Sequence, residues 1–518
     1  MKESPSIEIP VAPVKTAAAV DLHAFPWTSD QCDGTYRNPI LYADYSDPDV
    51  VRVGDDFYLV ASSFNCTPGL PILHSKDLVN WRIINHAIKN VPHSRYADVQ
   101  AGCGVWAPSI RFHAGKFWIF FPMPDEGIYV TTATAAAGKW SEPHLLQAGK
   151  GMIDPCPLWD EDGKAYLVHA YANSRAGIKH MLRVRPMAPD GSTLLGEGQI
   201  VFHEPKKHPT LEGPKFLKRN GWYYILAPAG GVETGWQVAL RSRNIYGPYE
   251  DKVILEQGHT AINGPHQGAL VDTANGDWWF VHFQDAGVYG RITHLQPVHW
   301  QDGWPMAGVN GEPVMQNPIP CGGIKRHQAV PQTSDEFDSS KLESQWQWQA
   351  NHRDDWYSCA ACGSRLRLFP QFFMHDNLSL LPNALLQKFP ARTFSVETLV
   401  EFSPKDADES AGLIVTGQSC ATLGLEKTGS TTQLVLRING VKKFAQDKVP
   451  HAIKLRIAVA DGGLCSFSYA TGKDFVLIPQ TFQAQKGIWI GAKVGLYSHR
   501  RLEHAAAGHV DFDYFRFA

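Results

Sequence analysis

The chain has 518 residues, too many for a single hydrophobic core, so two or three domains are expected. Hydrophobic residues make up 44% and charged residues 19% of the sequence, which is ordinary for a globular protein and argues against extensive disorder. The formal net charge is −3, and no basic run is interleaved with aromatic residues. Binding to nucleic acid or to an anionic membrane is therefore not expected.

Residues 1–35 are predicted to be an extension that precedes the first domain. They show no long apolar core and no clear cleavage pattern, and no stretch of the chain is apolar enough to span a membrane. The nine cysteines are scattered, with a single C-x-x-C at Cys359 and Cys362, which favours free thiols in a reducing compartment over a zinc site. We expect a cytoplasmic protein, with a periplasmic or secreted one as the alternative if a signal peptide has been removed.

Five segments between residues 36 and 318 share one plan: a polar or Pro-containing start, an apolar strand, a turn at Gly, and an aromatic-rich strand. Asp-Gly and Asn-Gly turns between short apolar runs are strong hairpin signals. Repeated β units about 45–60 residues apart are typical of propeller blades. The sequence therefore predicts a five-bladed β-propeller over residues 36–318. In such a fold the repeat starts converge at one end of the central channel, and here they are Asp47, Trp106, Asp154, Glu212 and His266.

The pattern changes after the fifth repeat. Residues 319–334 are rich in Pro, Gly and polar residues and are predicted to form a linker. From residue 335 onward short strands alternate between apolar and polar residues, most clearly over residues 394–402 and 509–517. We predict a β-sandwich of the jelly-roll, concanavalin-like kind over residues 335–518, so that the whole chain is all-β.

Asp47, Asp154 and Glu212 begin three different repeats, which predicts that they meet in one pocket. Hydrolysis of a glycosidic bond needs a proton donor for the leaving oxygen and a carboxylate that activates water or attacks the sugar. Two carboxyl groups in one pocket raise the pKa of one of them, which keeps a donor protonated near neutral pH. Taken singly, each acid is better explained as a turn residue at a strand end. Asp44 and Asp49 compete with Asp47 for its position.

A series of short motifs resembles glycoside hydrolase family 43. The motifs are Asn38-Pro39-Ile40, Tyr45-Ser46-Asp47-Pro48-Asp49, the run from His74 to Trp81, Trp106-Ala107-Pro108, Asp154-Pro155, Glu212-Gly213-Pro214, Gly290-Arg291, Gln296-Pro297, and the run from Trp300 to Pro305. The resemblance covers nearly the whole chain after the N-terminal extension. Its C-terminal part is similar to the sandwich of family members that act as β-xylosidases and α-L-arabinofuranosidases.

The resemblance implies a role for each acid. Asp47 would be the general base that activates water, Glu212 the general acid, and Asp154 the residue that orients the acid and tunes its pKa. The family inverts anomeric configuration, so no covalent intermediate is expected, and the base and acid must leave room for a water molecule. A retaining five-bladed fructan hydrolase and a non-catalytic sugar-binding propeller are the alternatives.

Four more residues are substrate-binding candidates by the same resemblance. Phe64 and Trp106 would form apolar walls of the pocket for the terminal sugar, although both are also explained as plain core packing. Arg291 would donate hydrogen bonds to sugar hydroxyls, with a surface salt bridge as its alternative. His266 would lie in the channel and hold a water or a calcium shell. No cofactor or metal is expected to be required, and calcium near His266 is the minority alternative.

The chain departs from the common family pattern at Ser46, where proline is frequent, and over residues 65–69. Both places are expected at the pocket rim, where they affect substrate preference and not the reaction. The sequence thus predicts an inverting, exo-acting hydrolase that releases terminal β-D-xylose, α-L-arabinofuranose or both from xylan-derived oligosaccharides or related plant glycans. It leaves open whether a sandwich loop narrows the pocket and whether the protein is a homo-oligomer.

Overall fold

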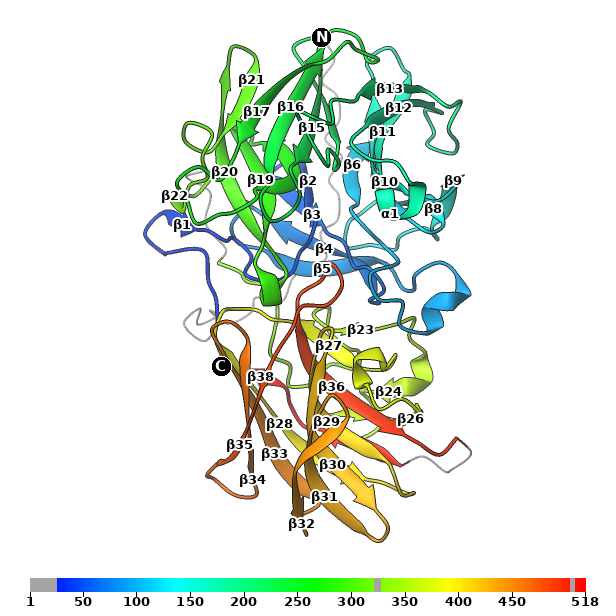
Figure 1. Ribbon diagram of the computed structural model, residues 1–518, viewed down its shortest axis with the longest axis vertical. Coiled ribbons are helices and arrows are strands. Elements are labelled where there is room, and N and C mark those ends of the chain that lie inside the picture. Colours follow the sequence, from blue (N-terminus) through cyan, green and yellow to red (C-terminus); the bar gives the residue numbers. More distant parts are fainter. Residues whose placement is uncertain (1–25, 321–327, 504–507) are drawn as a thin grey trace, which may run out of the picture.

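The computed structural model describes residues 26–320, 328–503 and 508–518. Within these residues the chain forms two β domains, a propeller and a sandwich, that follow one another along the long axis of the molecule (Figure 1). The prediction of an all-β chain with a five-bladed propeller followed by a β-sandwich is confirmed. No helix in these residues is long and apolar enough to cross a membrane. The helical elements are α1 (Asn173–Ala176), η2 (Ser94–Ala97), η3 (Gly287–Tyr289), η4 (Asp354–Trp356) and η5 (Leu378–Leu380).

Each blade is a four-stranded antiparallel sheet whose strands follow chain order. Blade 1 contains β2 (Asp49–Val53), β3 (Asp56–Val60), β4 (Gly69–Ser75) and β5 (Arg82–Ile88). Blade 2 contains β6 (Ser109–His113), β7 (Lys116–Met123), β8 (Gly127–Ala133) and β9 (His144–Ala148). Blade 3 contains β10 (Met152–Trp159), β11 (Ala165–Tyr171), β12 (Leu182–Met187) and β13 (Gln199–Phe202).

Two further blades complete the propeller. Blade 4 contains β14 (Lys215–Arg219), β15 (Trp222–Ala229), β16 (Trp236–Ser242) and β17 (Glu250–Leu255). Blade 5 contains β18 (His266–Asp272), β19 (Trp278–Asp285), β20 (Arg291–Gln301) and β21 (Trp304–Ala307). The start and end of the domain are joined by a two-stranded sheet of β1 (Thr35–Arg37) and β22 (Gln316–Pro318).

The Gly-containing turns form the first hairpin of each blade, as the sequence pattern predicts. In blade 4, Arg219 pairs with Trp222 across a two-residue loop of Asn220 and Gly221. Both loop residues have positive φ, at 52° and 69°, which is the geometry of a type I′ turn and the reason that Asn-Gly suits it. The turn returns the chain antiparallel, so the first strand of each blade is followed directly by its neighbour.

The first strand of each blade lies innermost and lines the channel. Strand β2 contacts both β6 and β18, and β10 contacts both β6 and β14, so the inner strands follow one another around the axis. The residues that precede these strands therefore gather at one end of the channel, although they are far apart in the sequence.

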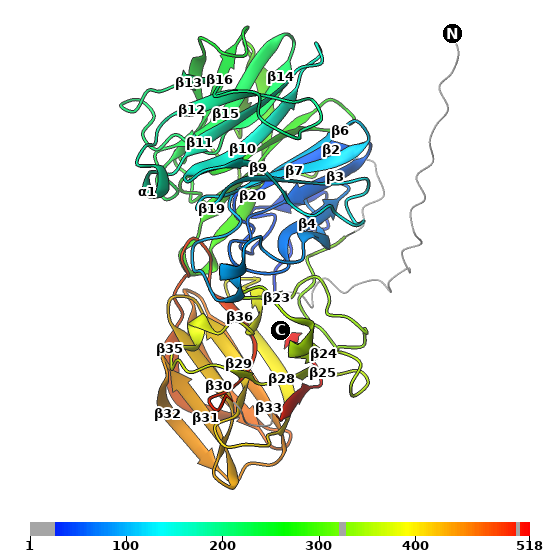
Figure 2. The same ribbon diagram turned by 90° about the vertical axis from the view of Figure 1, so that its right-hand side faces the viewer.

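The sandwich consists of two eight-stranded sheets (Figure 2). The first sheet contains β23 (Gln347–Trp348), β26 (Gln371–Phe372), β27 (Leu385–Lys388), β29 (Ser410–Thr416), β30 (Cys420–Thr428), β31 (Thr431–Ile438), β32 (Val441–Asp447) and β36 (Lys493–Arg500). The second contains β24 (Tyr357–Ser358), β25 (Leu366–Leu368), β28 (Phe394–Ser403), β33 (Ala452–Ala460), β34 (Leu464–Ala470), β35 (Val476–Gln483), β37 (His509–Phe512) and β38 (Arg516–Phe517).

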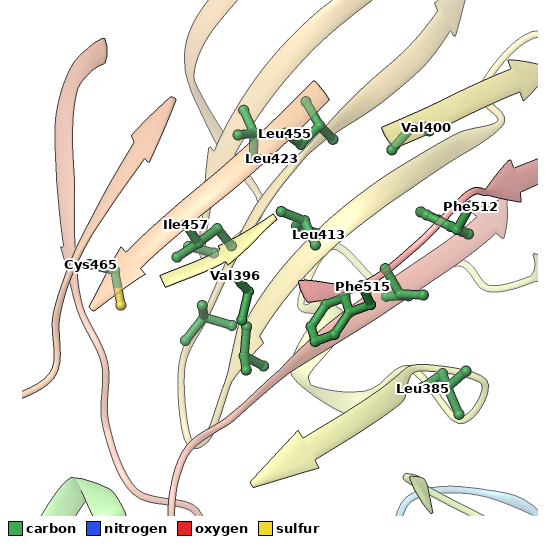
Figure 3. Close-up of a cluster of buried hydrophobic side chains, with 14 of the residues drawn as sticks. Leu385, Val396, Val400, Leu413, Leu423, Leu455, Ile457, Cys465, Phe512 and Phe515 are labelled. Atoms are coloured by element: carbon green, nitrogen blue, oxygen red, sulfur yellow. The ribbon is translucent and has the colours of Figure 1, made fainter. Parts of the chain in front are cut away.

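The core of the sandwich lies between its two sheets. Burial alternates along β28 at every second residue, as expected for a strand with one face on the core and one outside. Side chains from both sheets, such as Val396 and Leu413, meet in this layer (Figure 3). The same buried cluster includes Tyr42, Tyr289 and Ile292 of the propeller, so the two domains share apolar core across their junction.

The segment over residues 65–69 forms part of this junction. Thr67 and Trp348 exchange two backbone hydrogen bonds of 3.0 and 2.6 Å, and Asn65 Nδ2 donates to Gln349 O at 2.7 Å. Besides the expected place at the pocket rim, this segment thus has a second role, because it holds the sandwich against the propeller. A loop between β35 and β36 rises from the sandwich toward the propeller in both views (Figures 1 and 2).

Candidate active site

Asp47 lies immediately before β2 and is 4% exposed. Its Oδ2 accepts hydrogen bonds from Ser46 Oγ at 2.8 Å and Ser62 Oγ at 2.6 Å, and its Oδ1 accepts one from Arg291 Nη1 at 3.1 Å. All of these groups donate, so the Asp47 carboxyl is held as an acceptor with its two oxygens oriented. Ser46, which departs from the family pattern, therefore contacts the predicted base directly.

Asp154 and Glu212 meet from neighbouring blades. Asp154 Oδ2 accepts the Gly213 N–H at 2.8 Å, and Gln267 Nε2 lies 3.4 Å from Oδ1. Burial, together with the nearby charges of Glu212 and Asp47, raises the pKa of Asp154 to about 8. The Asp154 carboxyl therefore retains a proton at a pH where an isolated carboxyl would have lost it.

Glu212 is offset by one residue from the other two acids. Asp47 and Asp154 have positive φ, at 55° and 56°, and each directly precedes a proline. In blade 4 the residue with positive φ before the proline is Gly213, at 59°. A Cβ on Gly213 would stand 2.8 Å from the Gln267 side chain, so glycine fits the close packing here.

This offset gives Glu212 a different exposure. Its side chain is 26% exposed, against 6% for that of Asp47, and its Oε1 lies 3.3 Å from Nε2 of the buried His266. The Glu212 carboxyl thus reaches solvent while that of Asp47 lies deep. That arrangement suits protonation of a leaving group that projects out of the pocket.

The two competitors of Asp47 have other partners. Asp49 Oδ2 accepts Ile110 N–H and Arg111 Nη1, both at 2.7 Å. Asp44 accepts the backbone N–H of Arg291 on Oδ1 and that of Gly491 on Oδ2, both at 2.9 Å. Among these three acids, Asp47 is the one whose carboxylate accepts from the guanidinium of Arg291.

Aromatic side chains from both domains line the approach to Asp47. The rings of Phe64 and Trp106 lie 6.4 Å apart, and the ring of Trp489, in the β35–β36 loop of the sandwich, lies 6.1 Å from that of Trp106. The guanidinium of Arg291 lies 5.7 Å from the Trp489 ring and 4.8 Å from that of Phe283. The sandwich thus contributes an aromatic side chain, Trp489, beside Arg291, which donates to Asp47.

The sequence does not single out Trp489, Gln267 or Ser62. Trp489 is an aromatic residue between two glycines, Gly487 and Gly491, and no motif or spacing connects it to the propeller. Gln267 follows the repeat start at His266, so adjacency to a predicted channel residue is the signal that points to it. For Ser62 we find no sequence signal.

His266 is fully buried at the floor of the site, and its Nδ1 has no partner among the described residues. Calcium binds through six to eight oxygen ligands. In the described part of the chain no group of three or more His, Cys, Asp or Glu is arranged to hold a metal ion. These surroundings do not fit a calcium shell made by the protein alone, and calcium near His266 stays a prediction.

Two family models match the chain over most of its length. The model of glycosyl hydrolases family 43 matches residues 36–305, and that of the β-xylosidase C-terminal concanavalin A-like domain matches residues 334–518. A putative β-xylosidase of Xylanibacter ruminicola is 39% identical over 477 residues, which are 90% of this chain and 86% of that protein.

Two further relatives are similar over most of their length. The non-reducing end α-L-arabinofuranosidase BoGH43B of Bacteroides ovatus is 31% identical over 80% of this chain and 79% of its own. The crystal structure of the GH43 BlXynB protein from Bacillus licheniformis aligns with a TM-score of 0.82 and 25% identity, over 93% of this chain and 99% of that chain. The chain belongs to glycoside hydrolase family 43.

Proposed function

We propose that this enzyme is an inverting, exo-acting hydrolase that releases a single terminal pentose, β-D-xylose or α-L-arabinofuranose, from xylan-derived oligosaccharides or related plant glycans. The observation that carries the proposal is the pairing of Asp154 with the backbone of Gly213, next to Glu212, in the same buried site as Asp47. The buried Asp154 carboxyl there has a raised pKa, and the Asp47 carboxylate is held by cationic and hydroxyl donors.

Asp47 is the general base in this proposal. A water molecule between Asp47 and the anomeric carbon loses its proton to the carboxylate as it attacks the sugar from the face opposite the leaving group. Arg291 and the hydroxyls of Ser46 and Ser62 keep the carboxylate in place, so little reorganisation is needed during the step. Arg291 also has donors left for sugar hydroxyls.

Glu212 is the general acid and Asp154 its partner. A proton passes from Glu212 to the glycosidic oxygen as the bond breaks. The negative charge that then remains lies beside Asp154, whose pKa is raised by burial and by the nearby charge of Glu212. His266 Nε2 lies 3.3 Å from Glu212 Oε1 and orients the acid from below.

Exo action follows from the walls of the site. Phe64, Trp106 and Trp489 enclose the approach to Asp47 from two domains, which suits one terminal sugar better than the middle of a chain. The names of the relatives, a putative β-xylosidase and a non-reducing end α-L-arabinofuranosidase, support a pentose. Xylose and L-arabinofuranose present similar hydroxyls, so one pocket is proposed to accept both.

The remaining expectations stand as proposals. Eight of the cysteines lie in the described residues as free thiols, and this supports a cytoplasmic location. No cofactor is needed for the proposed steps, since the protein's own carboxyls carry the proton transfers. Whether the protein forms a homo-oligomer is a question for a measurement of its molecular mass in solution.

Replacing Asp47 by Ala removes the base, so kcat on aryl β-xylosides and aryl α-arabinofuranosides should fall by about 10²- to 10⁴-fold. Steady-state kinetics measure the effect, and sugar binding by calorimetry should persist. The exposed turn residue of the same blade provides the matched control, Asp55→Ala, which should behave as wild type. Near-normal turnover by Asp47→Ala would leave this residue without the proposed role.

Replacing Glu212 by Gln removes the proton donor, and the loss should grow as the leaving group becomes poorer. Substrates with good leaving groups, such as dinitrophenyl xyloside, need little protonation, whereas xylobiose needs it most. A series of aryl xylosides of graded leaving-group pKa measures the slope. Equal losses across the series would show that Glu212 is not the acid.

Asp154→Asn should change the pH dependence of stability. The folded-state pKa of Asp154, about 8, lies above the ordinary value of 3.8 that it has in the unfolded chain, so stability from this group is lost as pH rises between these values. Asn cannot ionise, and the unfolding temperature of the variant should exceed that of wild type increasingly from pH 5 to pH 8, by about 2 °C or more at the upper end. A constant difference across this range would contradict the raised pKa.

Trp489→Ala should test the contribution of the sandwich to the pocket. We expect KM for aryl pentosides to rise about tenfold, equivalent to roughly 1.4 kcal/mol, with a smaller effect on kcat, because the wall and not the acid–base pair is removed. Trp489→Phe keeps an aromatic wall and should recover most of the loss. An unchanged KM in Trp489→Ala would place the terminal sugar away from the sandwich.

A further inference from the structure

A second set of buried polar side chains lies in the channel, a few residues past the catalytic carboxylates on the same inner strands. Asp49 and Cys156 stand two residues after Asp47 and Asp154, and Lys215 stands three residues after Glu212. Asp49, Cys156 and Lys215 are 0%, 0% and 2% exposed. Asp49 and Lys215 are the first residues of β2 and β14, and Cys156 lies in β10, so all three stand on inner strands of different blades.

Lys215 crosses the channel. Its Nζ donates to Pro108 O at 2.6 Å and to Ser109 Oγ at 2.8 Å, both in blade 2, and lies 3.8 Å from Asp49 Oδ2 in blade 1. A lysine that is 98% buried is rare without such partners, because the desolvation of its charge is costly. The side chain therefore ties blade 4 to blades 1 and 2 from the inside.

These contacts connect the proposed base and acid through a short path. Asp47 is two residues from Asp49, the ion pair joins Asp49 to Lys215, and Lys215 is three residues from Glu212. Inverting hydrolysis depends on the separation of base and acid, because a water molecule must fit beside the sugar. Asp49 and Lys215 are buried and have little freedom to move, so the path through them restricts the separation of Asp47 and Glu212.

Arg111 completes the set. Its Nη1 donates to Asp49 Oδ2 at 2.7 Å, and its Nη2 lies 2.8 Å from Cys156 Sγ, which also accepts Phe216 N–H at 3.2 Å. Two cations, Arg111 and Lys215, thus face one carboxylate, Asp49, whose Oδ1 has no partner among the described residues. The surplus positive charge lies close enough to Asp154 for Lys215 to lower the pKa of its carboxyl.

We propose that Lys215 is a positioning residue for the hydrolytic reaction: its ion pair with Asp49 fixes the separation of Asp47 and Glu212, and its charge offsets the repulsion among the carboxylates above it. The proposal rests on the acid–base roles given above. The charge of Lys215 lowers the pKa of Asp154 against the larger effects of burial and of Glu212, in agreement with this placement. The titratable and charged groups around Lys215 are Asp49, Arg111, Cys156 and Asp154.

Lys215→Met tests the proposal, because Met keeps much of the volume and removes the charge. We expect kcat on an aryl pentoside to fall about 10- to 100-fold with little change in KM, since a small misplacement of catalytic groups affects the chemical step most. The pH optimum should move to higher pH, because loss of a buried cation raises the pKa of neighbouring carboxyls. Because Asp49 and Lys215 act through one ion pair, the double variant Asp49→Asn/Lys215→Met should lower kcat by less than the product of the two single effects.

Lys218→Met is the matched control. Lys218 lies on the same strand β14, but its ammonium pairs with Asp160 and Glu161 outside the channel. The control should keep the kcat and the pH optimum of wild type. A Lys215→Met protein that lost unfolding temperature but kept both kcat and pH optimum would overturn the proposal and leave Lys215 a structural residue.

A second readout does not depend on the substrate. The difference in unfolding temperature between Lys215→Met/Asp154→Asn and Lys215→Met is measured as a function of pH. The difference between Asp154→Asn and wild type is measured in the same way. The pH at which the difference stops growing should be higher in the pair that lacks Lys215. An identical pH would contradict the charge coupling, whereas failure of wild type to hydrolyse pentosides would contradict only the proposed function.

Discussion

Three carboxyl groups brought together in one buried site repel one another, and much of the structure around them compensates for this repulsion. Arg291 and two hydroxyls donate to Asp47, the Gly213 N–H donates to Asp154, and the charge of Lys215 acts on Asp154 from a few residues along the inner strands. The compensation is incomplete at Asp154, where burial first, and then the nearby charge of Glu212, raise the pKa of the carboxyl. In the proposed mechanism, a proton retained beside Glu212 is available for the leaving group.

A further carboxylate links the site to the second domain. Asp44 accepts one N–H from Arg291, which donates to Asp47, and one from Gly491, which lies two residues after Trp489 in the sandwich loop. Neighbouring Gly290 fits this junction because a Cβ there would stand 2.5 Å from Asp44. The Asp44 carboxylate thus joins the backbone of Arg291 in the propeller to the backbone of the loop that carries Trp489 in the sandwich.

The propeller and its three acids could be predicted because their signals are local. Asn-Gly and Asp-Gly turns determine hairpins within a few residues, and repeated hairpins place strand starts at one end of a channel. The offset of Glu212 is visible as one extra residue before Pro214, but its consequence for exposure appears only in three dimensions. Trp489 and Gly491 could not be predicted, because their partners Trp106 and Asp44 are several hundred residues away and no periodicity connects them. The segment over residues 65–69 shows the same limit, since its contacts with Trp348 and Gln349 depend on how the domains dock.

The stereochemistry of the first-formed sugar tests the central claim most directly, because it reports whether a water activated by one carboxylate displaces a leaving group protonated by another. Proton NMR of an aryl β-D-xyloside during hydrolysis, recorded before mutarotation, resolves the two anomers of free xylose. The arrangement of Asp47 and Glu212 predicts that α-xylose accumulates first. First appearance of β-xylose would mean a covalent intermediate and would contradict the assignment of Asp47 as a base.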